Sequence, residues 1–267
     1  MKKHPVFRQF FLLIGLVVFL YACGREIEIL AKPSTDYYPM ETGKYKIYQI
    51  DSIVYDEYNC AVDTVTFQIK EVTGDTVWDG EDALAYKVER HYRADNSQSW
   101  LLTGVWIEKL ENYQIQRVEE NQRIIKLVFP IKETKYWDGI VYIRRDTLVP
   151  LRGGAIDMFK DWDDFTYQEI DVSFVNPITA DYYEETVLVN QVDKTNNIER
   201  RYSRERYAKG IGLVYKEMKI LDSQCRRPGG VKTCDGVGNI ADCIFLPWEE
   251  KAEKGFILTQ TLIEHNY

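Results

Sequence analysis

Apolar and polar residues alternate with a period of two along much of the chain after residue 37. In the segment TVTFQIK, for example, Val65, Phe67 and Ile69 fall on one face and polar residues fall on the other. Neighbouring side chains of a strand point to opposite faces of a sheet, so this pattern predicts strands with one buried face. The segment LAYKVERHY repeats the pattern.

Further segments predict strands for the same reason: YKIYQIDSIVY, RIIKLVFPI, EIDVSFV, TVLVNQV, IGLVYKEMKIL and GFILTQTLI. Turn signals such as TGDT, WDGED, RADNS and VDKTNN separate several of them. Closely spaced strands joined by turns predict an all-β fold, mainly an antiparallel meander arranged as a curved sheet, a sandwich or an open barrel.

Helical signals are sparse, so at most one or two short helices are expected. The segment AIDMFKDWDDF is compatible with a short helix. The segment NNIERRYSRERY is compatible with a helix or with a charged strand leading into AKGIGLVYKE, and we favour the strand.

The start of the chain differs from the rest. An apolar run from Phe10 to Ala22 follows the basic residues Lys2, Lys3 and Arg8. As a helix this run spans about 20 Å, whereas the hydrocarbon core of a membrane is about 30 Å thick. The run is therefore too short for a permanent transmembrane anchor, and it has the features of a secretory signal.

The residues LYAC at the end of this run resemble the lipobox of bacterial lipoproteins, with Leu20 three places before Cys23 and the small Ala22 directly before it. The resemblance implies a diacylglycerol thioether on Cys23, cleavage before it, and acylation of the new amino end, typically with palmitate. An ordinary leader with an incidental cysteine is the alternative. We expect a signal peptide over residues 1–22, a tether over 23–36 and one β-rich domain over 37–267.

A doubly or triply acylated cysteine gives stable membrane attachment. No second long apolar run follows Cys23. Gly24 is not the aspartate that retains lipoproteins at the inner membrane of enteric bacteria, so the resemblance favours the outer membrane. Which face of that membrane the domain occupies stays open.

The charge balance restricts the partners that the chain can bind. The sequence has 42 acidic residues against 34 Lys and Arg, a net charge of −8. A negative surface repels nucleic acid and anionic lipid headgroups, so neither is an expected partner.

Four cysteines follow Cys23, namely Cys60, Cys225, Cys234 and Cys243. An even number in an exported chain predicts two disulfides, and three pairings are possible. Zinc sites usually place two cysteines two to four residues apart, which this chain does not, so no metal site is expected.

No cofactor and no catalytic residue are assigned. The segment DGVGNIA, with Gly236, Gly238 and Ala241, has the spacing of a dinucleotide-binding turn but lies between two cysteines with no βαβ pattern. The motifs of serine hydrolases and zinc proteases, G-x-S-x-G and H-E-x-x-H, do not occur in the sequence.

The segment DWDDF brings together Asp161, Asp163 and Asp164. Clustered carboxylates can bind calcium or form the acid/base pair of a glycosidase. The spacing lacks the ligand ladder of an EF-hand, and a solvated loop is the favoured interpretation.

A basic cluster occurs near residue 200 and consists of Arg200, Arg201, Arg204, Arg206 and Lys209. It is a candidate binding site for an acidic partner or a lipopolysaccharide phosphate. Glutamates are interleaved with these residues, so cross-strand ion pairs on the surface explain the pattern equally well.

Three segments, YYPMETGKYKIYQIDS, FPIKETKYWDG and ERYAKGIGLVYKE, resemble a lipoprotein family of the Bacteroidota. The family brings no known activity. At the level of the fold it is similar to the curved antiparallel sheets of lipoprotein-carrier proteins, an analogy that assigns no function by itself.

Two function hypotheses follow. The first is a lipid-anchored cell-envelope lipoprotein that is not an enzyme and binds a small apolar ligand or an envelope protein. The alternative is a hydrolase of envelope glycans or lipids. The sequence leaves the ligand, the partner and the oligomeric state open.

Overall fold

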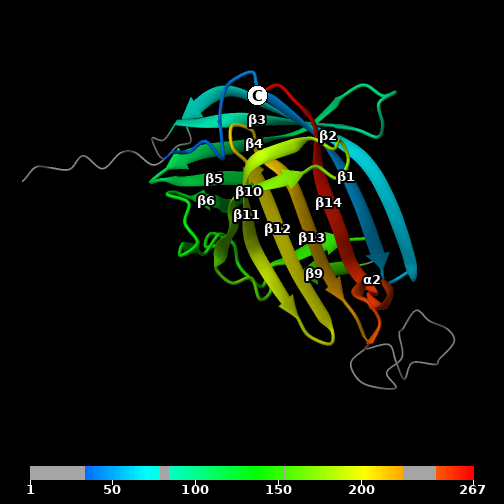
Figure 1. Ribbon diagram of the computed structural model, residues 1–267. Helices are drawn as coiled ribbons and strands as arrows, with labels where there is room; N and C mark the ends of the chain where they lie inside the picture. Colours follow the sequence, from blue (N-terminus) through cyan, green and yellow to red (C-terminus); the bar gives the residue numbers. More distant parts are fainter. Residues whose placement is uncertain (1–33, 79–83, 153, 225–244) are drawn as a thin grey trace, which may run out of the picture. The chain divides into compact units, whose positions relative to one another are not determined.

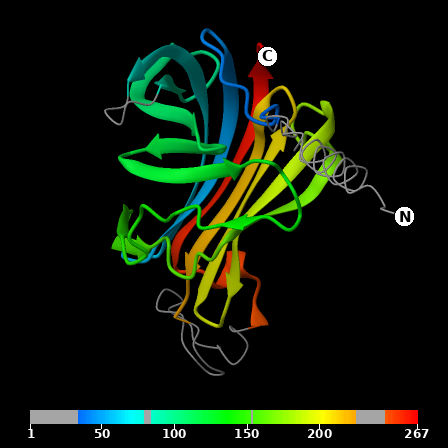
Figure 2. The same cartoon turned by 90° about the vertical axis from the view of Figure 1, so that its left-hand side faces the viewer.

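The predicted strands form one twelve-stranded antiparallel sheet that is curved until it nearly closes on itself (Figures 1 and 2). The structure is a computed structural model and describes residues 34–78, 84–152, 154–224 and 245–267. The all-β, antiparallel prediction is confirmed, with the curved, barrel-like arrangement among the three that the sequence allowed.

The large sheet contains the strands β1 (Tyr45–Asp56), β2 (Ala61–Trp78), β3 (Leu84–Arg93), β4 (Leu101–Glu111), β5 (Gln114–Glu119), β6 (Gln122–Val128), β7 (Tyr136–Trp137), β10 (Phe165–Val175), β11 (Tyr182–Thr195), β12 (Glu199–Ala208), β13 (Gly212–Asp222) and β14 (Lys254–His265). The strands β8 (Leu148–Leu151) and β9 (Gly154–Asp157) form a separate hairpin. The helix in the described ranges is the single turn α2 (Trp248–Lys251).

The order of the strands divides the sheet into two halves. It runs β6-β5-β4-β3-β2-β1-β14-β13-β12-β11-β10-β7. Strands β1 to β6 form one half, strands β10 to β14 with β7 form the other, and β1 pairs with β14 between them. Figure 2 shows the blue β1 and the red β14 running side by side at this junction.

The two far edges of the sheet are linked by side chains. The hydroxyl of Tyr167 on β10 accepts a hydrogen bond from the Val128 N–H at 2.8 Å and donates one to the Val128 carbonyl at 2.9 Å. Trp137 Nε1 donates to the Ile125 carbonyl at 2.8 Å, and the Ile125 N–H donates to the Gly139 carbonyl at 2.8 Å. Polar groups of the edge strand β6 are thereby satisfied inside the domain, as a nearly closed sheet requires.

Tight turns explain how β4, β5 and β6 lie next to one another. Asn112 and Tyr113 join β4 to β5, and Glu120 and Asn121 join β5 to β6. All four residues have positive φ, between 46° and 64°. Two consecutive positive φ values define the two-residue hairpin turn that matches the natural twist of paired strands.

The short helix with which AIDMFKDWDDF is compatible does not form. The segment contributes β9, a turn and the first residue of β10. Phe159, Trp162 and Phe165 are all buried, which gives the three-residue spacing of a helix, but Asp161 has a φ of 59° and interrupts any helical path. The three aromatic rings pack with centroids 5.3 and 5.9 Å apart instead. The strand favoured for NNIERRYSRERY is confirmed as β12.

Gly255 allows β14 to begin its pairing between β1 and β13. Its φ is +116°, and a Cβ atom at this position would lie 1.9 Å from the carbonyl oxygen of Ile220. Neither the backbone angle nor the space admits another residue, so this glycine fixes the start of the central strand.

We predict that Gly255→Ala lowers the free energy of unfolding by about 2–4 kcal/mol, because the methyl group must displace the β13 backbone. The urea midpoint of unfolding measures the effect. Gly104→Ala is the matched control, since no atom lies within 4 Å of its added Cβ and its φ is not positive. An unchanged midpoint in Gly255→Ala would contradict the described backbone.

Candidate functional site

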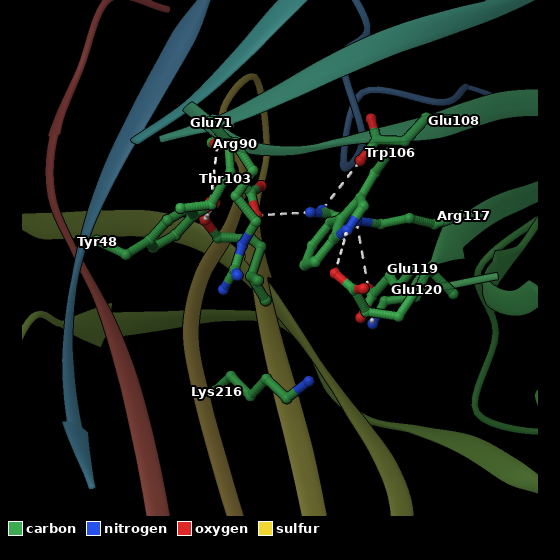
Figure 3. A network of polar contacts seen from close by, with 12 residues as sticks. Tyr48, Glu71, Arg90, Thr103, Trp106, Glu108, Arg117, Glu119, Glu120 and Lys216 are labelled. Carbon is green, nitrogen blue, oxygen red and sulfur yellow. Dashed lines mark hydrogen bonds and ion pairs between the residues drawn. The ribbon is translucent and has the colours of Figure 1, made fainter. Parts of the chain in front are cut away.

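Charged side chains lie next to one another on the inner face of β2 to β5. These are Glu71 on β2, Arg90 on β3, Glu108 on β4, and Arg117 and Glu119 on β5. Glu71 is directly opposite Arg90 in the strand register, and Glu108 is directly opposite Arg117. Opposite charges in register across neighbouring strands attract each other. Figure 3 shows this group from close by.

Arg117 connects three carboxylates. Its Nη2 lies 2.6 Å from Glu71 Oε1, its Nη1 lies 3.0 Å from Glu108 Oε1, and its Nε lies 3.3 Å from Glu119 Oε1. Burial alone would lower the pKa of Arg117, but the attraction of Glu71 and Glu108 outweighs burial and raises that pKa well above its usual value. The guanidinium is therefore a permanent buried cation.

Trp106 on β4 is fixed between two guanidinium groups. The central carbons of Arg90 and Arg117 each lie 4.5 Å from the centre of its ring. Its indole N–H donates to Glu120 Oε1 at 3.3 Å. A cation over an indole face is attracted by the negative charge of the ring face, so the ring has a defined orientation.

A second group of charges joins the two halves of the sheet. Glu205 on β12 is fully buried, and its Oε1 lies 2.6 Å from Lys126 Nζ on β6 and 3.1 Å from Lys216 Nζ on β13. The Tyr207 hydroxyl donates to Glu205 Oε2 at 2.5 Å. Lys126 Nζ also lies 3.6 Å from Glu119 Oε1. We call Glu71, Arg90, Glu108, Arg117, Glu119, Lys126, Glu205 and Lys216 the inner charge cluster.

Two carboxylates of the inner charge cluster, Glu205 and Glu119, are held in the ionised form. Burial would raise the pKa of Glu205, but Lys126 and Lys216 outweigh it and hold that pKa well below its usual value. Burial likewise opposes ionisation of Glu119, and Lys126 with Arg117 reverses the effect and lowers its pKa.

The segment before β1 covers one end of the cluster. The Tyr38 hydroxyl donates to Glu108 Oε1 at 2.6 Å, and its ring lies 5.8 Å from that of Tyr207. Tyr37 and Tyr38 are both buried. The described part of the chain therefore packs into the domain from residue 37 on.

A cavity of about 130 Å³ opens beside the cluster, between the two halves of the sheet. We call it the inner cavity. Its polar wall residues are Glu119, Glu120, Gln122, Lys126, Gln191 and Lys216, and its apolar wall residues are Trp106, Ile124, Met158, Phe159, Trp162 and Met218.

Gln191 enters the wall of the inner cavity because of a β-bulge. The register of β11 against β12 shifts between Asn190 and Val192, which leaves Gln191 as the extra residue. Its side chain is 2% exposed, and its Oε1 accepts a hydrogen bond from Ser203 Oγ at 2.6 Å. Its amide nitrogen has no acceptor among the described residues. Bulges commonly re-aim a side chain next to a functional site.

The basic cluster predicted from the sequence does not form one patch. Arg201 points inward, is 1% exposed, and donates to the carbonyls of Asp157 and Leu221. Arg200 and Arg204 lie together on the outer face, where both contact Asp193. Alternation along β12 produces this separation.

The remaining two cations of that cluster have their own partners. Arg206 is nearly buried and contacts Glu169, and Lys209 lies 3.1 Å from Glu185. Binding of an acidic partner at these residues stays a prediction.

The aspartates of DWDDF do not converge. Asp161, Asp163 and Asp164 are all exposed, and Asp163 lies 2.5 Å from Lys194. These three residues therefore do not provide the carboxylate pair that the hydrolase alternative needs.

Several predicted residues lie outside the described part of the chain. They are the signal peptide over 1–22, Cys23, most of the tether over 23–36, the DGVGNIA segment, and Cys225, Cys234 and Cys243. Cys60 lies in the turn between β1 and β2. Lipidation at Cys23 and the disulfide pairing stay predictions.

The described residues contain neither a metal-binding group nor a membrane-spanning helix. No group of three or more His, Cys, Asp or Glu side chains there is placed to hold a metal ion. Nor does a helix in those ranges have the length and apolar content needed to span a bilayer.

Sequence reasoning missed the inner charge cluster and Gln191. Strands β4 and β5 were not among the predicted segments, because their inner positions carry Glu108, Arg117 and Glu119 instead of apolar residues. The sequence did contain a signal: Arg117 and Glu119 are two residues apart, a spacing that places both side chains on the same face of a strand.

Comparison with protein-family models gives no match, and neither does comparison with curated proteins. A crystal structure described as a candidate lipoprotein from Parabacteroides distasonis ATCC 8503 is similar over 88% of this chain and 100% of its own, at 10% identity and a TM-score of 0.41. A candidate exported protein with a YmcC-like fold from Bacteroides fragilis NCTC 9343 is similar over 86% and 98%, at 11% identity and a TM-score of 0.32. No inference about function follows from similarity at this level, and the family resemblance stays a prediction.

We predict that Glu205→Gln destabilises the fold by about 3–5 kcal/mol, because it leaves Lys126 and Lys216 buried without their carboxylate. Urea denaturation of wild type and variant provides the measurement. Glu185→Gln, which breaks the exposed pair with Lys209, is the control and should leave the midpoint unchanged. Equal midpoints for both variants would show that the buried pairing does not stabilise the fold.

The pH dependence of stability follows from the lowered pKa values of Glu205 and Glu119. Their contribution is complete above about pH 4.3, the usual pKa of an unfolded glutamate, and is lost as the pH falls toward the folded pKa values. Stability should therefore fall on acidification below about pH 4.3. Glu205→Gln should reduce that slope by up to about 1.4 kcal/mol per pH unit. If the free energy of unfolding of wild type and of Glu205→Gln had the same slope between pH 5 and pH 3, the lowered pKa of Glu205 would be contradicted.

Proposed function

We propose that the chain is a lipid-anchored envelope protein, attached through Cys23, whose β domain binds a small molecule in the inner cavity without catalysing a reaction. The observation that carries the binding proposal is the bulge residue Gln191. Its amide oxygen is held by Ser203 in the cavity wall, and its amide nitrogen has no acceptor among the described residues. The same wall contains the buried indole N–H of Trp162, which also lacks an acceptor there. A buried polar group with unused hydrogen-bonding capacity is costly unless a ligand or water completes it.

The charges around the inner cavity favour binding over acid–base catalysis. A general acid or base works best when its pKa lies near the working pH. The pKa values of Glu119 and Glu205 are both lowered by neighbouring cations. Both carboxylates stay ionised at neutral pH, so neither is suited to donate a proton.

The sequence led us to expect a small apolar ligand, but the charged residues in the cavity wall favour a ligand that carries polar groups. Glu119, Lys126 and Lys216 reach the cavity, and a wholly apolar ligand would remove water from them without replacing its hydrogen bonds. The volume supports a compact ligand as well. A cavity of about 150 Å³ holds one benzene ring, so about 130 Å³ suits one ring and not an acyl chain.

Mass spectrometry of the full chain, purified from the membranes of a lipoprotein-processing bacterium, tests both parts of the proposal. Under denaturing conditions we expect a chain that begins at Cys23 and carries acyl groups. Under native conditions we expect an additional small-molecule mass that disappears on denaturation. Cys23→Ser should remove the lipid mass and leave the bound small molecule unchanged, because the mutation lies outside the β domain.

Two outcomes would contradict the proposal. A wild-type chain that keeps residues 1–22 or lacks lipid would overturn the anchor. A native mass equal to the denatured mass, under conditions that preserve a known complex measured in parallel, would overturn the small-molecule site. The outer-membrane location and the binding of a protein partner are separate hypotheses that this measurement does not address.

A further inference from the structure

The inner cavity combines aromatic walls with paired opposite charges, and this combination restricts the class of ligand. We infer that the ligand is a neutral polyhydroxylated ring, that is, a single sugar unit of a carbohydrate. The inference rests on the small-molecule site proposed above and specifies what that site takes.

The charge balance of the wall argues for a neutral ligand. Glu119 and Glu120 contribute two negative charges, and Lys126 and Lys216 contribute two positive charges. An anionic ligand would be repelled by the two glutamates, and a cationic ligand by the two lysines. Behind the wall, Glu205 adds one negative charge beside both lysines and Arg117 adds one positive charge beside Glu119, so three negative and three positive charges balance and no net charge remains to attract an ion.

The free hydrogen-bonding groups are of both kinds. The Gln191 amide nitrogen and the Lys216 ammonium can donate, since Lys216 has one ion-pair partner among the described residues, Glu205. Glu119 Oε2 can accept, because the ion pairs of this carboxylate with Arg117 and Lys126 both use Oε1. A hydroxyl group donates one hydrogen bond and accepts others, so a ring that carries several hydroxyls uses donors and acceptors together.

The apolar part of the wall suits the faces of such a ring. Phe159 and Trp162 meet edge to face with centroids 5.3 Å apart, and the Trp106 ring is fixed by its hydrogen bond to Glu120. The C–H surfaces of a sugar ring can be buried against Phe159 and Trp162, whereas the faces of Trp106 are covered by Arg90 and Arg117. The indole N–H of Trp162 also lacks an acceptor among the described residues.

The size of the cavity matches a single ring. A cavity of about 150 Å³ holds benzene, so about 130 Å³ encloses at most one six-membered ring and leaves its outer hydroxyl groups at the mouth of the cavity. Glu120 and Gln122 stand where the β5–β6 turn meets solvent, so substituents of the ring can extend outward there. We therefore expect the terminal unit of a longer glycan to bind as well as the free sugar.

Titration of the full chain, in a detergent without a sugar headgroup, tests the ligand class through tryptophan fluorescence, to which Trp106 and Trp162 in the cavity wall contribute along with the other four tryptophans. The probes are glucose, galactose, mannose and N-acetylglucosamine, with glucuronate, glucosamine and cyclohexanol as charged and apolar analogues of similar size. We expect a saturable change with at least one neutral sugar, and at least tenfold weaker binding of the corresponding analogues.

Variants assign the change to the inner cavity. Gln191→Met removes the free amide at similar volume and should weaken binding about tenfold, the effect of one lost hydrogen bond. Gln168→Met, on the exposed face of β10, is the matched control and should bind as wild type does. If Gln191→Met does not fold, Lys216→Met should give the same weakening, with Lys219→Met on the outer face as its control.

The outcomes separate this inference from the proposed function. Equal or tighter binding of glucuronate, glucosamine or cyclohexanol, or a bound mass in the native spectrum that is not a carbohydrate, overturns the sugar assignment and leaves the small-molecule site intact. Sugar binding that is unchanged in both Gln191→Met and Lys216→Met overturns the assignment to this cavity. No bound mass and no response to any probe overturns both proposals.

Discussion

The ion pair between Lys126 and Glu205 is the contact on which the interior of this domain depends. Lys126 lies on β6, at one edge of the sheet, and Glu205 lies on β12, in the other half of the sheet and three strands from the opposite edge strand β7. Neither can be buried alone, because an unpaired charge in a protein interior costs several kcal/mol. The sheet must therefore curve far enough to bring the two side chains together. Hydrogen bonds that join Tyr167 and Trp137 to the backbone of β6 also hold the two halves of the sheet together.

The charged interior has a second effect, which concerns specificity. Glu71 meets Arg117, and Glu108 meets both Arg117 and Tyr38, so each ion requires a particular register of its strand. A slip by one residue would turn these side chains outward and leave their partners unpaired. The same charges keep the wall of the inner cavity polar, which is why the site suits hydroxyl groups better than an acyl chain.

The sequence was sufficient for the fold class, because most strands, such as β2 and β3, have the ordinary alternation of apolar and polar residues. It was insufficient for β4 and β5, where Glu108, Arg117 and Glu119 occupy inner positions that usually hold apolar residues. Arg201 shows the same limit. It belongs to a run of basic residues that looks like a surface patch, yet side chains alternate between the two faces of β12, and Arg201 falls on the inner face. Partners of a buried ion come from strands far apart in the chain, and no local pattern identifies them.

The pairing of β1 with β14 has a consequence for how the domain is made. Of the described strands, β1 is the first to be synthesised and β14 is the last, yet they are neighbours in the middle of the sheet. Until β14 is available, β1 and β13 each present an unpaired edge, and such edges promote aggregation. Contacts between such distant segments also slow folding. A nascent chain of this protein therefore needs protection from self-association until β14 has been synthesised, and truncation of β14 should leave two half-sheets and not a smaller version of the domain.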